Sequence, residues 1–164
     1  VFLSVGRLAV EKNIETFLKL DLPGTKVVVG GGPARGGLQA RFPDAVFLGM
    51  RRGEDLAAVY AAADVFVFPS RTDTFGLVML EALSSGVPVA AFPVAGPSDV
   101  IGQAPVGALD EDLRAACLKA LTLSRETCRA FALGAGWEAS AQRFLANLAK
   151  AHAKPGNTGV PAAA

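Results

Sequence analysis

The sequence predicts an α/β fold of the Rossmann type: a doubly wound parallel sheet of six strands, with helices on both faces and extra helices at the C-terminus. Short runs rich in Val, Phe and Leu recur along the chain, and helix-length segments separate them. Continuous apolar runs are typical of strands buried on both faces, and their alternation with helices indicates a parallel sheet. The expected strands are Val1–Val5, Lys26–Gly30, Ala45–Leu48, Val65–Phe68, Pro88–Ala91 and Pro105–Leu109.

Helices are expected between these strands and after the last of them. Beyond Leu109 the pattern is purely helical, which gives the extra C-terminal helices. The acidic run Asp110-Glu111-Asp112 precedes a helical segment, and acids favour the first turn of a helix. We interpret that run as a helix cap, not as a metal-binding cluster. The expected helices are Val10–Leu20, Leu38–Arg41, Gly53–Ala62, Gly76–Ser84, Pro97–Ile101, Asp110–Thr122, Arg125–Leu133 and Trp137–Ala153.

The chain is expected to hold one domain, at residues 1–153. Its 164 residues are enough for one core and too few for two ordinary domains. Residues 154–164 contain Pro, Gly and Ala without a core-forming pattern, so we expect a disordered tail. The chain opens directly on an apolar strand without a methionine, which indicates a fragment cut at a domain boundary of a longer protein.

The composition excludes several classes of function. Sixteen basic and 15 acidic residues give a net charge of +1, which offers no electrostatic basis for binding nucleic acid or an anionic membrane. No apolar run approaches the roughly 20 residues of a membrane span. Cys117 and Cys128 lack a metal-ligand spacing and are expected to be free buried thiols of a cytoplasmic protein. The only histidine, His152, lies near the tail, so an imidazole base would have to come from elsewhere.

The loop and helix of residues 68–81 follow the fourth expected strand and are the strongest candidate for a ligand site. In a doubly wound sheet, ligands bind beyond the carboxyl ends of the strands. Gly76 allows close backbone approach, and the helix start there offers unpaired N–H groups to a diphosphate. Asp73 precedes this start, and Glu81 lies about 7–8 Å further along the helix, so both suit sugar hydroxyls. Alternatively, Asp73 and Thr74 merely cap the helix and Glu81 faces solvent.

Two further loops carry candidate ligand groups. Arg7 and Lys12 follow the first strand and could neutralise a diphosphate from the opposite side; alternatively, Arg7 is solvated and Glu11 pairs with Lys12 at the surface. The run Gly30-Gly31-Gly32-Pro33 suggests a dinucleotide-binding loop. However, counted from Gly30, the dinucleotide fingerprint requires a glycine at position 35, where this chain has arginine. These glycines are expected to let the backbone pass close to a ligand or a neighbouring helix.

Taken together, these motifs resemble the C-terminal domain of family 4 retaining glycosyltransferases of the GT-B fold, from Val1 to about Leu148. The family has an acidic pair, usually two glutamates, with seven residues between them. Here the pair is Asp73 and Glu81, with Phe75-Gly76-Leu77 between them. The pattern Thr-Asp-Thr-Phe-Gly-Leu, followed by Glu-Ala-Leu and Gly-Val-Pro-Val, is similar to a mannosyltransferase-like bacterial and plant subgroup.

The resemblance implies roles for individual residues. Arg7 and Lys12 would bind the donor diphosphate, Glu81 the ribose hydroxyls, and Asp73 the transferred sugar. The shorter side chain of Asp73 departs from the family's usual glutamate. The catalytic set is therefore Arg7, Lys12, Asp73 and Glu81. The further donor-binding residues are Gly6, Gly31, Gly32, Pro33, Arg51, Thr74, Phe75, Gly76 and Leu77.

The resemblance also implies the reaction. A hexose would pass from a UDP- or GDP-sugar to a hydroxyl of a sugar, lipid or polysaccharide acceptor, with retention of configuration and without metal or cofactor. The acceptor site, and any peripheral membrane association, would belong to an N-terminal domain absent from this chain, so the isolated domain would be inactive. The alternatives are a GT-B-fold sugar-nucleotide epimerase or hydrolase, and a non-catalytic nucleotide-binding module.

Overall fold

The computed structural model describes residues 1–73 and 76–134. Residues Val1–Leu133 form one compact unit, and Gly134–Ala164 are assigned to a second. The predicted helix Trp137–Ala153 and the predicted tail lie outside the described residues.

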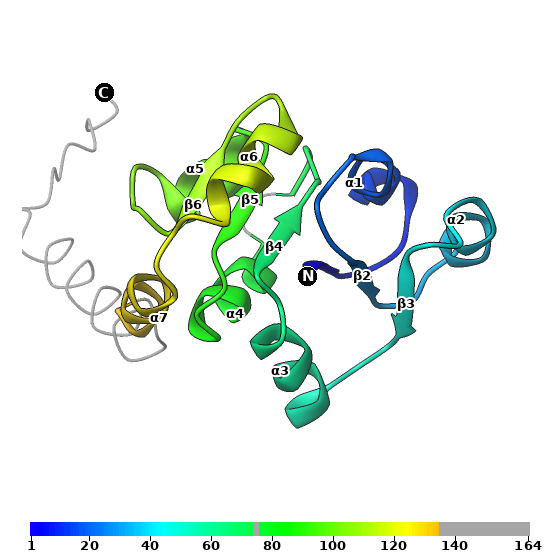
Figure 1. The fold of residues 1–164 in the computed structure, drawn as a ribbon, viewed down its shortest axis with the longest axis horizontal. Helices are drawn as coiled ribbons and strands as arrows, with labels where there is room; N and C mark the ends of the chain where they lie inside the picture. Colours follow the sequence, from blue (N-terminus) through cyan, green and yellow to red (C-terminus); the bar gives the residue numbers. More distant parts are fainter. Residues whose placement is uncertain (74–75, 135–164) are drawn as a thin grey trace, which may run out of the picture. The chain divides into compact units, whose positions relative to one another are not determined.

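Six parallel strands form a single sheet in the order β3-β2-β1-β4-β5-β6, which confirms the predicted fold class (Figure 1). The first three strands are built outwards from β1, and the next three run outwards on its other side. The order in which strands are added to the sheet therefore reverses between β1 and β4, which are neighbours but lead to opposite edges. The strands are β1 (Phe2–Val5), β2 (Lys26–Val29), β3 (Val46–Gly49), β4 (Val65–Phe68), β5 (Val89–Ala91) and β6 (Gly107–Leu109).

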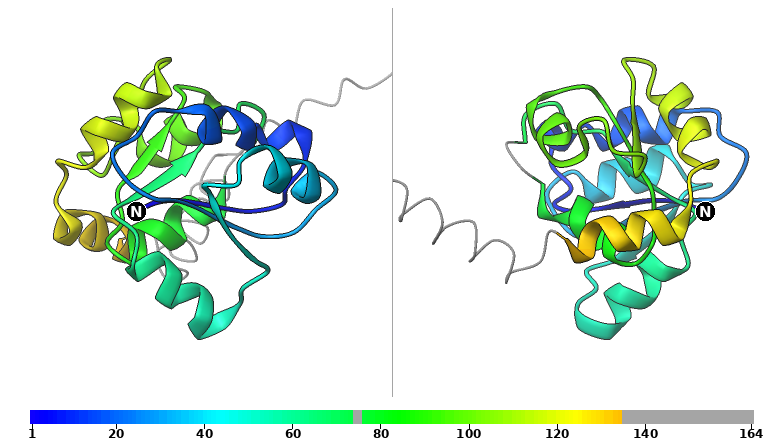
Figure 2. Two further views of the ribbon diagram at one scale, coloured as in Figure 1. Left: turned by 45° about the vertical axis from the view of Figure 1, so that its right-hand side comes forward. Right: turned by 90° about the vertical axis from the view of Figure 1, so that its left-hand side faces the viewer.

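Helices cover both faces of this sheet, because successive strand residues point to opposite sides. On one face, Phe66 packs among side chains of α3, α4 and α7, and on the other, Val65 and Val67 pack among side chains of α1, α2 and α6. Helices α4 and α7 lie side by side (Figure 2). The helices are the 3-10 turn η1 (Val10–Lys12) and α1 (Ile14–Lys19), α2 (Arg35–Arg41), α3 (Gly53–Ala61), α4 (Leu77–Ser84), α5 (Ala95–Ile101), α6 (Leu113–Ala120) and α7 (Arg125–Leu133).

The expected helix Val10–Leu20 is divided in the structure. Asn13 has a φ of 55° and separates η1 from α1. This left-handed conformation ends one helical segment and redirects the next, and asparagine adopts it more readily than most residues with a Cβ. The prediction of one undivided helix from Val10 to Leu20 is therefore wrong, because the helix is interrupted at Asn13.

The acidic run before α6 caps that helix, as the sequence predicted. The Asp112 carboxylate accepts hydrogen bonds from the backbone N–H groups of Arg114 and Ala115, at 2.9 and 3.2 Å. These are N–H groups that a helix start leaves unpaired. Cys117 and Cys128 are free and buried, in α6 and α7.

The glycine run after β2 lies against the loop that follows β1. Leu8 donates its N–H to the carbonyl of Gly31 at 2.8 Å, and Ala34 donates to the carbonyl of Leu8 at 3.0 Å. A Cβ at Gly30 would lie 1.9 Å from the carbonyl oxygen of Gly6, and one at Gly32 would lie 2.4 Å from that of Leu8. The neighbour that requires these glycines is thus a loop, not the helix considered from the sequence.

We expect Gly30→Ala to destabilise the fold by about 1–3 kcal/mol or more, because alanine is strained at a φ of 137° and its methyl group would overlap Gly6. Gly36→Ala is the matched control: it lies in α2 with open space around it, and alanine there should be neutral or stabilise by up to about 1 kcal/mol. Urea unfolding followed by circular dichroism measures both variants. Equal stability of the two would contradict this account of the loop packing.

Candidate functional site

A pocket of about 740 Å³ opens at the carboxyl ends of β1 and β4. This is the point where the chain reverses across the sheet, so the loops leaving the two strands diverge and leave room between them. The first loop, the segment after β4 and the start of α4 all contribute to its walls. The residues predicted from the sequence that line the pocket are Gly6, Arg7, Lys12, Asp73, Gly76 and Leu77.

Lys12 and Asp73 form an ion pair across the pocket, between Nζ and Oδ1. The lysine follows β1 and the aspartate follows β4, so tertiary structure joins positions 61 residues apart. Both side chains are mostly buried, with 29% and 21% of their surfaces exposed. The surface pair between Glu11 and Lys12 is thus not the arrangement in the structure, where Glu11 lies 3.9 Å from Arg7.

The pKa of Asp73 lies below its ordinary value. Partial burial acts to raise that pKa, but hydrogen bonds from Lys12 and Ser70 and the lysine charge outweigh burial. The carboxylate is therefore ionised at neutral pH. Its second oxygen, Oδ2, is buried and has no hydrogen-bond partner among the described residues. A hydroxyl group that donated to this oxygen would satisfy it.

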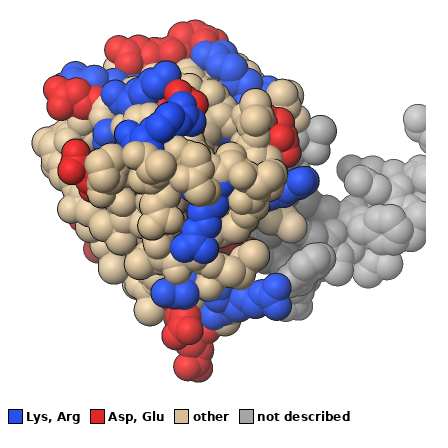
Figure 3. All heavy atoms as spheres, turned by 90° about the vertical axis from the view of Figure 1, so that its right-hand side faces the viewer, with Lys and Arg blue, Asp and Glu red and all other residues tan. Residues whose placement is uncertain are grey.

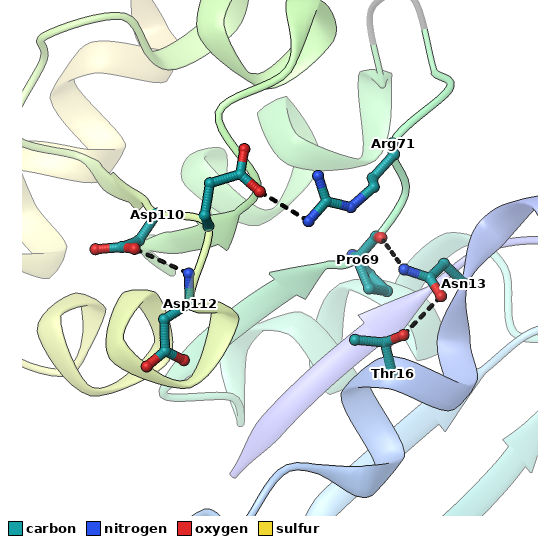
Figure 4. A network of polar contacts seen from close by, with 7 residues as sticks. Asn13, Thr16, Pro69, Arg71, Asp110 and Asp112 are labelled. Carbon is teal, nitrogen blue, oxygen red and sulfur yellow. Dashed lines mark hydrogen bonds and ion pairs between the residues drawn. The ribbon is translucent and has the colours of Figure 1, made fainter.

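Asn13 joins the two loops that carry this ion pair (Figure 4). Its Nδ2 donates a hydrogen bond to the carbonyl oxygen of Pro69 at 3.0 Å, and its Oδ1 accepts one from Thr16 at 2.7 Å. The adjacent residue Lys12 is thereby held against the segment that leads to Asp73. Sequence reasoning missed Asn13; the signal would have been an asparagine at a break in the apolar periodicity.

Arg71 fastens the same segment to the loops that follow β5 and β6, on the side away from the first loop. Its guanidinium lies 3.6 Å from the ring centre of Phe92, which follows β5, and its Nη2 donates to Glu111 at 2.9 Å (Figure 4). The ion pair is exposed and contributes little, whereas stacking on a buried ring holds the arginine more firmly. Sequence reasoning missed this residue too, because neither partner is near it in the chain.

The start of α4 leaves its first backbone N–H groups available. Gly76 is the N-cap residue, with a φ of 73°, and no side chain of residues 1–73 or 76–134 is found capping the helix there. The residues that follow it, Leu77 and Val78, line the pocket. Asp73 pairs with Lys12 instead of capping the helix, while Thr74 and Phe75 lie outside the described residues. An anion in the pocket could thus meet a helix start.

Glu81 lies one turn further along α4, beyond the residues that line the pocket. The residue is exposed, yet its Oε2 accepts a hydrogen bond from the hydroxyl of Tyr60 at 2.9 Å. The alternative that Glu81 faces solvent is therefore correct for its exposure, but its carboxylate is also bonded to another helix. Nothing in the sequence pattern indicated Tyr60, because its partner lies 21 residues away on another helix.

The remaining predicted residues lie apart from the pocket walls. Gly31 and Gly32 pack on the first loop, as described above, and Pro33 is exposed beside them. Arg51 is exposed in the loop after β3, where it donates to the neighbouring carbonyl of Met50 at 3.1 Å. These four predicted residues are therefore not among those that line the pocket, although Gly31 and Gly32 contact the loop that carries Arg7.

On the face drawn in Figure 3, Lys and Arg side chains form separate groups with Asp and Glu among them, and no continuous basic patch is seen there. Among residues 1–73 and 76–134, no group of three or more His, Cys, Asp and Glu side chains is arranged to hold a metal ion. In the same residues, none of the helices has the length and hydropathy of a transmembrane span.

Residues 1–124 match the family model of the group 1 glycosyl transferases. The chain belongs to this family. A GDP-mannose-dependent alpha-mannosyltransferase of Mycobacterium tuberculosis is 46% identical over 99 residues, which are 59% of this chain and 26% of that protein. The sulfoquinovosyl transferase of Arabidopsis thaliana is 43% identical over 102 residues, 59% of this chain and 20% of that relative. The glycosyltransferase domain thus spans about a quarter of the length of the curated relatives it matches.

Solved structures show the same fold. AviGT4, a glycosyltransferase involved in avilamycin A biosynthesis, superposes with a TM-score of 0.75 at 19% identity, over 94% of this chain and 52% of its own. The pneumococcal O-GlcNAc transferase, solved with UDP and GlcNAc, superposes with a TM-score of 0.69 at 20% identity, over 93% and 36%. The chain is thus a Rossmann-like domain of the GT-B glycosyltransferases, as the resemblance in sequence implied.

The ion pair between Lys12 and Asp73 should make stability depend on pH. The pKa of Asp73 is lowered by folding, so the pair stabilises the fold above about pH 4, the ordinary aspartate value, and this contribution is lost as the pH falls through the folded pKa. We expect Lys12→Met to cost about 1–3 kcal/mol at pH 7 and progressively less below pH 4. Chemical unfolding at a series of pH values measures the difference.

The matched control for this series is Lys119→Met, which removes an exposed cation from α6. Its difference from the wild type should be small and independent of pH. A cost for Lys12→Met that stays constant from pH 7 to pH 2 would show that Asp73 does not titrate as the partner of Lys12.

Proposed function

We propose that this domain binds the nucleoside-diphosphate sugar donor of a retaining hexosyltransferase, in the pocket between β1 and β4. The observation that carries the proposal is the ion pair across that pocket, which places a cation and an ionised carboxylate beside a helix start. A nucleotide sugar carries the matching groups, namely two phosphates and a set of hydroxyls. In the whole protein, the hexose would be transferred to an acceptor hydroxyl with its configuration retained.

The diphosphate would lie between the first loop and α4. Arg7 has an exposed side chain that lines the pocket, and its guanidinium can bind phosphate oxygens in pairs. Lys12 contributes a second cation, and the backbone N–H groups at Gly76 and Leu77 contribute partial positive charge. Negative charge grows on the diphosphate as it leaves the sugar, so these groups would stabilise the transition state.

The two carboxylates would bind hydroxyl groups at the two ends of the diphosphate. Asp73 holds Lys12 through one oxygen, and its other oxygen is buried without a partner among the described residues, which supports a contact with the transferred sugar. Glu81, further along α4, would hold the ribose.

The donor is proposed to be GDP-mannose or a UDP-hexose. The relative from Mycobacterium tuberculosis is named for GDP-mannose, which favours a guanine nucleotide. The acceptor, whether sugar, lipid or polysaccharide, would be bound by an N-terminal domain outside this chain, and residues 1–153 would form the donor domain. On this proposal the isolated chain binds nucleotide and transfers nothing, and any membrane association comes through the other domain.

Titration of the chain with GDP and UDP tests this proposal. We expect amide chemical shifts of Arg7 and Gly76 to move in NMR spectra, because both residues line the pocket. Arg7→Ala should weaken nucleotide binding about 10- to 100-fold, the effect of losing a hydrogen-bonded charge on phosphate, and added salt should reduce the difference. Calorimetry measures the affinities.

Lys19→Ala is the control for the loss of one positive charge, because Lys19 pairs with Glu15 on α1 away from the pocket. It should bind nucleotide as the wild type does. Unmoved amides at both loops at millimolar nucleotide would overturn the proposal. Turnover of labelled sugar donors by a protein that joins this domain to its acceptor domain would separate transfer from epimerisation.

A further inference from the structure

Tyr60 is the only tyrosine of the chain, and its side chain connects α3 to α4, the helix whose start lines the pocket. It lies near the end of α3, with only 2% of its surface exposed, and its ring packs against Phe66 with ring centres 5.8 Å apart. The hydroxyl leaves this apolar surrounding and reaches Oε2 of Glu81 on α4, at 2.9 Å. A buried tyrosine commonly pairs its hydroxyl in this way.

The direction of this hydrogen bond is settled by chemistry. An ionised carboxylate only accepts, so the tyrosine donates. Burial, followed by the charge of Glu81, raises the pKa of Tyr60 well above its ordinary value, so the phenol stays protonated. The carbonyl of Val78 is also within 3.5 Å of the hydroxyl, but the shorter contact is with the carboxylate.

The helix that carries Tyr60 is fixed relative to α4, so the tyrosine hydroxyl can hold the carboxylate of Glu81 in place. Arg125, at the start of α7, donates to the carbonyl of Ala63 after α3 at 2.6 Å and to that of Ser85 after α4 at 3.4 Å. The ends of both helices are therefore tied to one side chain. Tyr60 and Glu81 consequently keep a defined separation.

Glu81 is an exposed residue with three side-chain torsions, and such a side chain ordinarily samples many rotamers. The bond from Tyr60 selects those rotamers that place Oε2 at the hydroxyl. Glu81 follows Leu77 and Val78, which line the pocket, by four and three residues, so it lies on the same face of α4 one turn further along the helix.

We propose that Tyr60 is a positioning residue for nucleotide recognition: it anchors one oxygen of Glu81 so that the other accepts hydrogen bonds from the ribose hydroxyls of the donor. The inference rests on the proposed function, in which Glu81 binds the ribose. It adds that preference for a ribonucleotide over a deoxynucleotide depends on a tyrosine that does not touch the ligand.

Tyr60→Phe tests this inference, because it keeps the ring in its packing and removes only the hydroxyl. The dissociation constants of GDP and UDP are measured beside those of their 2′-deoxy and 3′-deoxy counterparts, with the complete chain. We expect Tyr60→Phe to weaken ribonucleotide binding about 5- to 10-fold and to leave the deoxynucleotides nearly unchanged, so that the preference collapses. A merely structural role would weaken all of these nucleotides equally.

Two further variants make the result specific. Ser84→Ala removes a hydrogen bond to the backbone carbonyl of Glu81, at 2.8 Å, without touching its carboxylate, and should leave the ribose preference intact. Glu81→Ala should abolish the preference, and adding Tyr60→Phe to it should cause no further loss, because both substitutions remove the same interaction.

The outcomes distinguish this inference from the proposed function. If Glu81→Ala abolishes the ribose preference and Tyr60→Phe retains it, Tyr60 is not a positioning residue and donor binding stands. If Tyr60→Phe weakens ribo- and deoxynucleotides alike, the hydroxyl serves packing alone and the inference is overturned. If the wild type binds none of these nucleotides, the proposed function fails and this inference fails with it.

Discussion

β1 and β4 pair in parallel, with Phe2 opposite Val65 and Leu3 opposite Phe66, yet the chain leaves them for opposite halves of the sheet. The loops that follow two such strands must diverge, since one turns towards β2 and the other towards β5. Side chains therefore do not fill the space at this edge, and a pocket results. The position of every group in the candidate site depends on this reversal, which also accounts for the long separation in sequence between Lys12 and Asp73.

Divergent loops need restraints, and the structure supplies one on each side of the segment after β4. Asn13, from the first loop, donates a hydrogen bond to the carbonyl of Pro69, while Arg71 of the same segment stacks on Phe92, which follows β5. On the other side of the first loop, the backbone of Gly30 lies against that of Gly6, so the loop cannot move closer to β2. The charged groups of the pocket are thus carried by loops, but by loops fixed to the sheet, which is the preorganisation that electrostatic stabilisation requires.

A second level of support lies beneath α4. Apolar packing around Tyr60 and the hydrogen bonds of Arg125 fix α3 and α4 relative to one another. The hydroxyl of Tyr60 then holds the carboxylate of Glu81 in a defined position. The group 1 glycosyltransferase domain therefore separates two tasks. The side chain of Arg7 is exposed at the pocket, whereas Lys12 and Asp73 are mostly buried and Glu81 is held by the buried Tyr60.

The sequence alone determined the fold class, the six strands and the helix cap at Asp112, because apolar periodicity and capping are local properties that chain neighbours decide. It also indicated Arg7, Lys12, Asp73 and Gly76, since they follow buried strands, and ligands of a doubly wound sheet bind beyond the carboxyl ends of its strands. Tertiary structure alone decided that Lys12 meets Asp73, that Asn13 and Arg71 brace their loop, and that Tyr60 reaches Glu81. It also placed Gly31, Gly32, Pro33 and Arg51 away from the pocket walls. These contacts join residues far apart in the chain, and their geometry depends on strand order and loop direction, which no local pattern encodes.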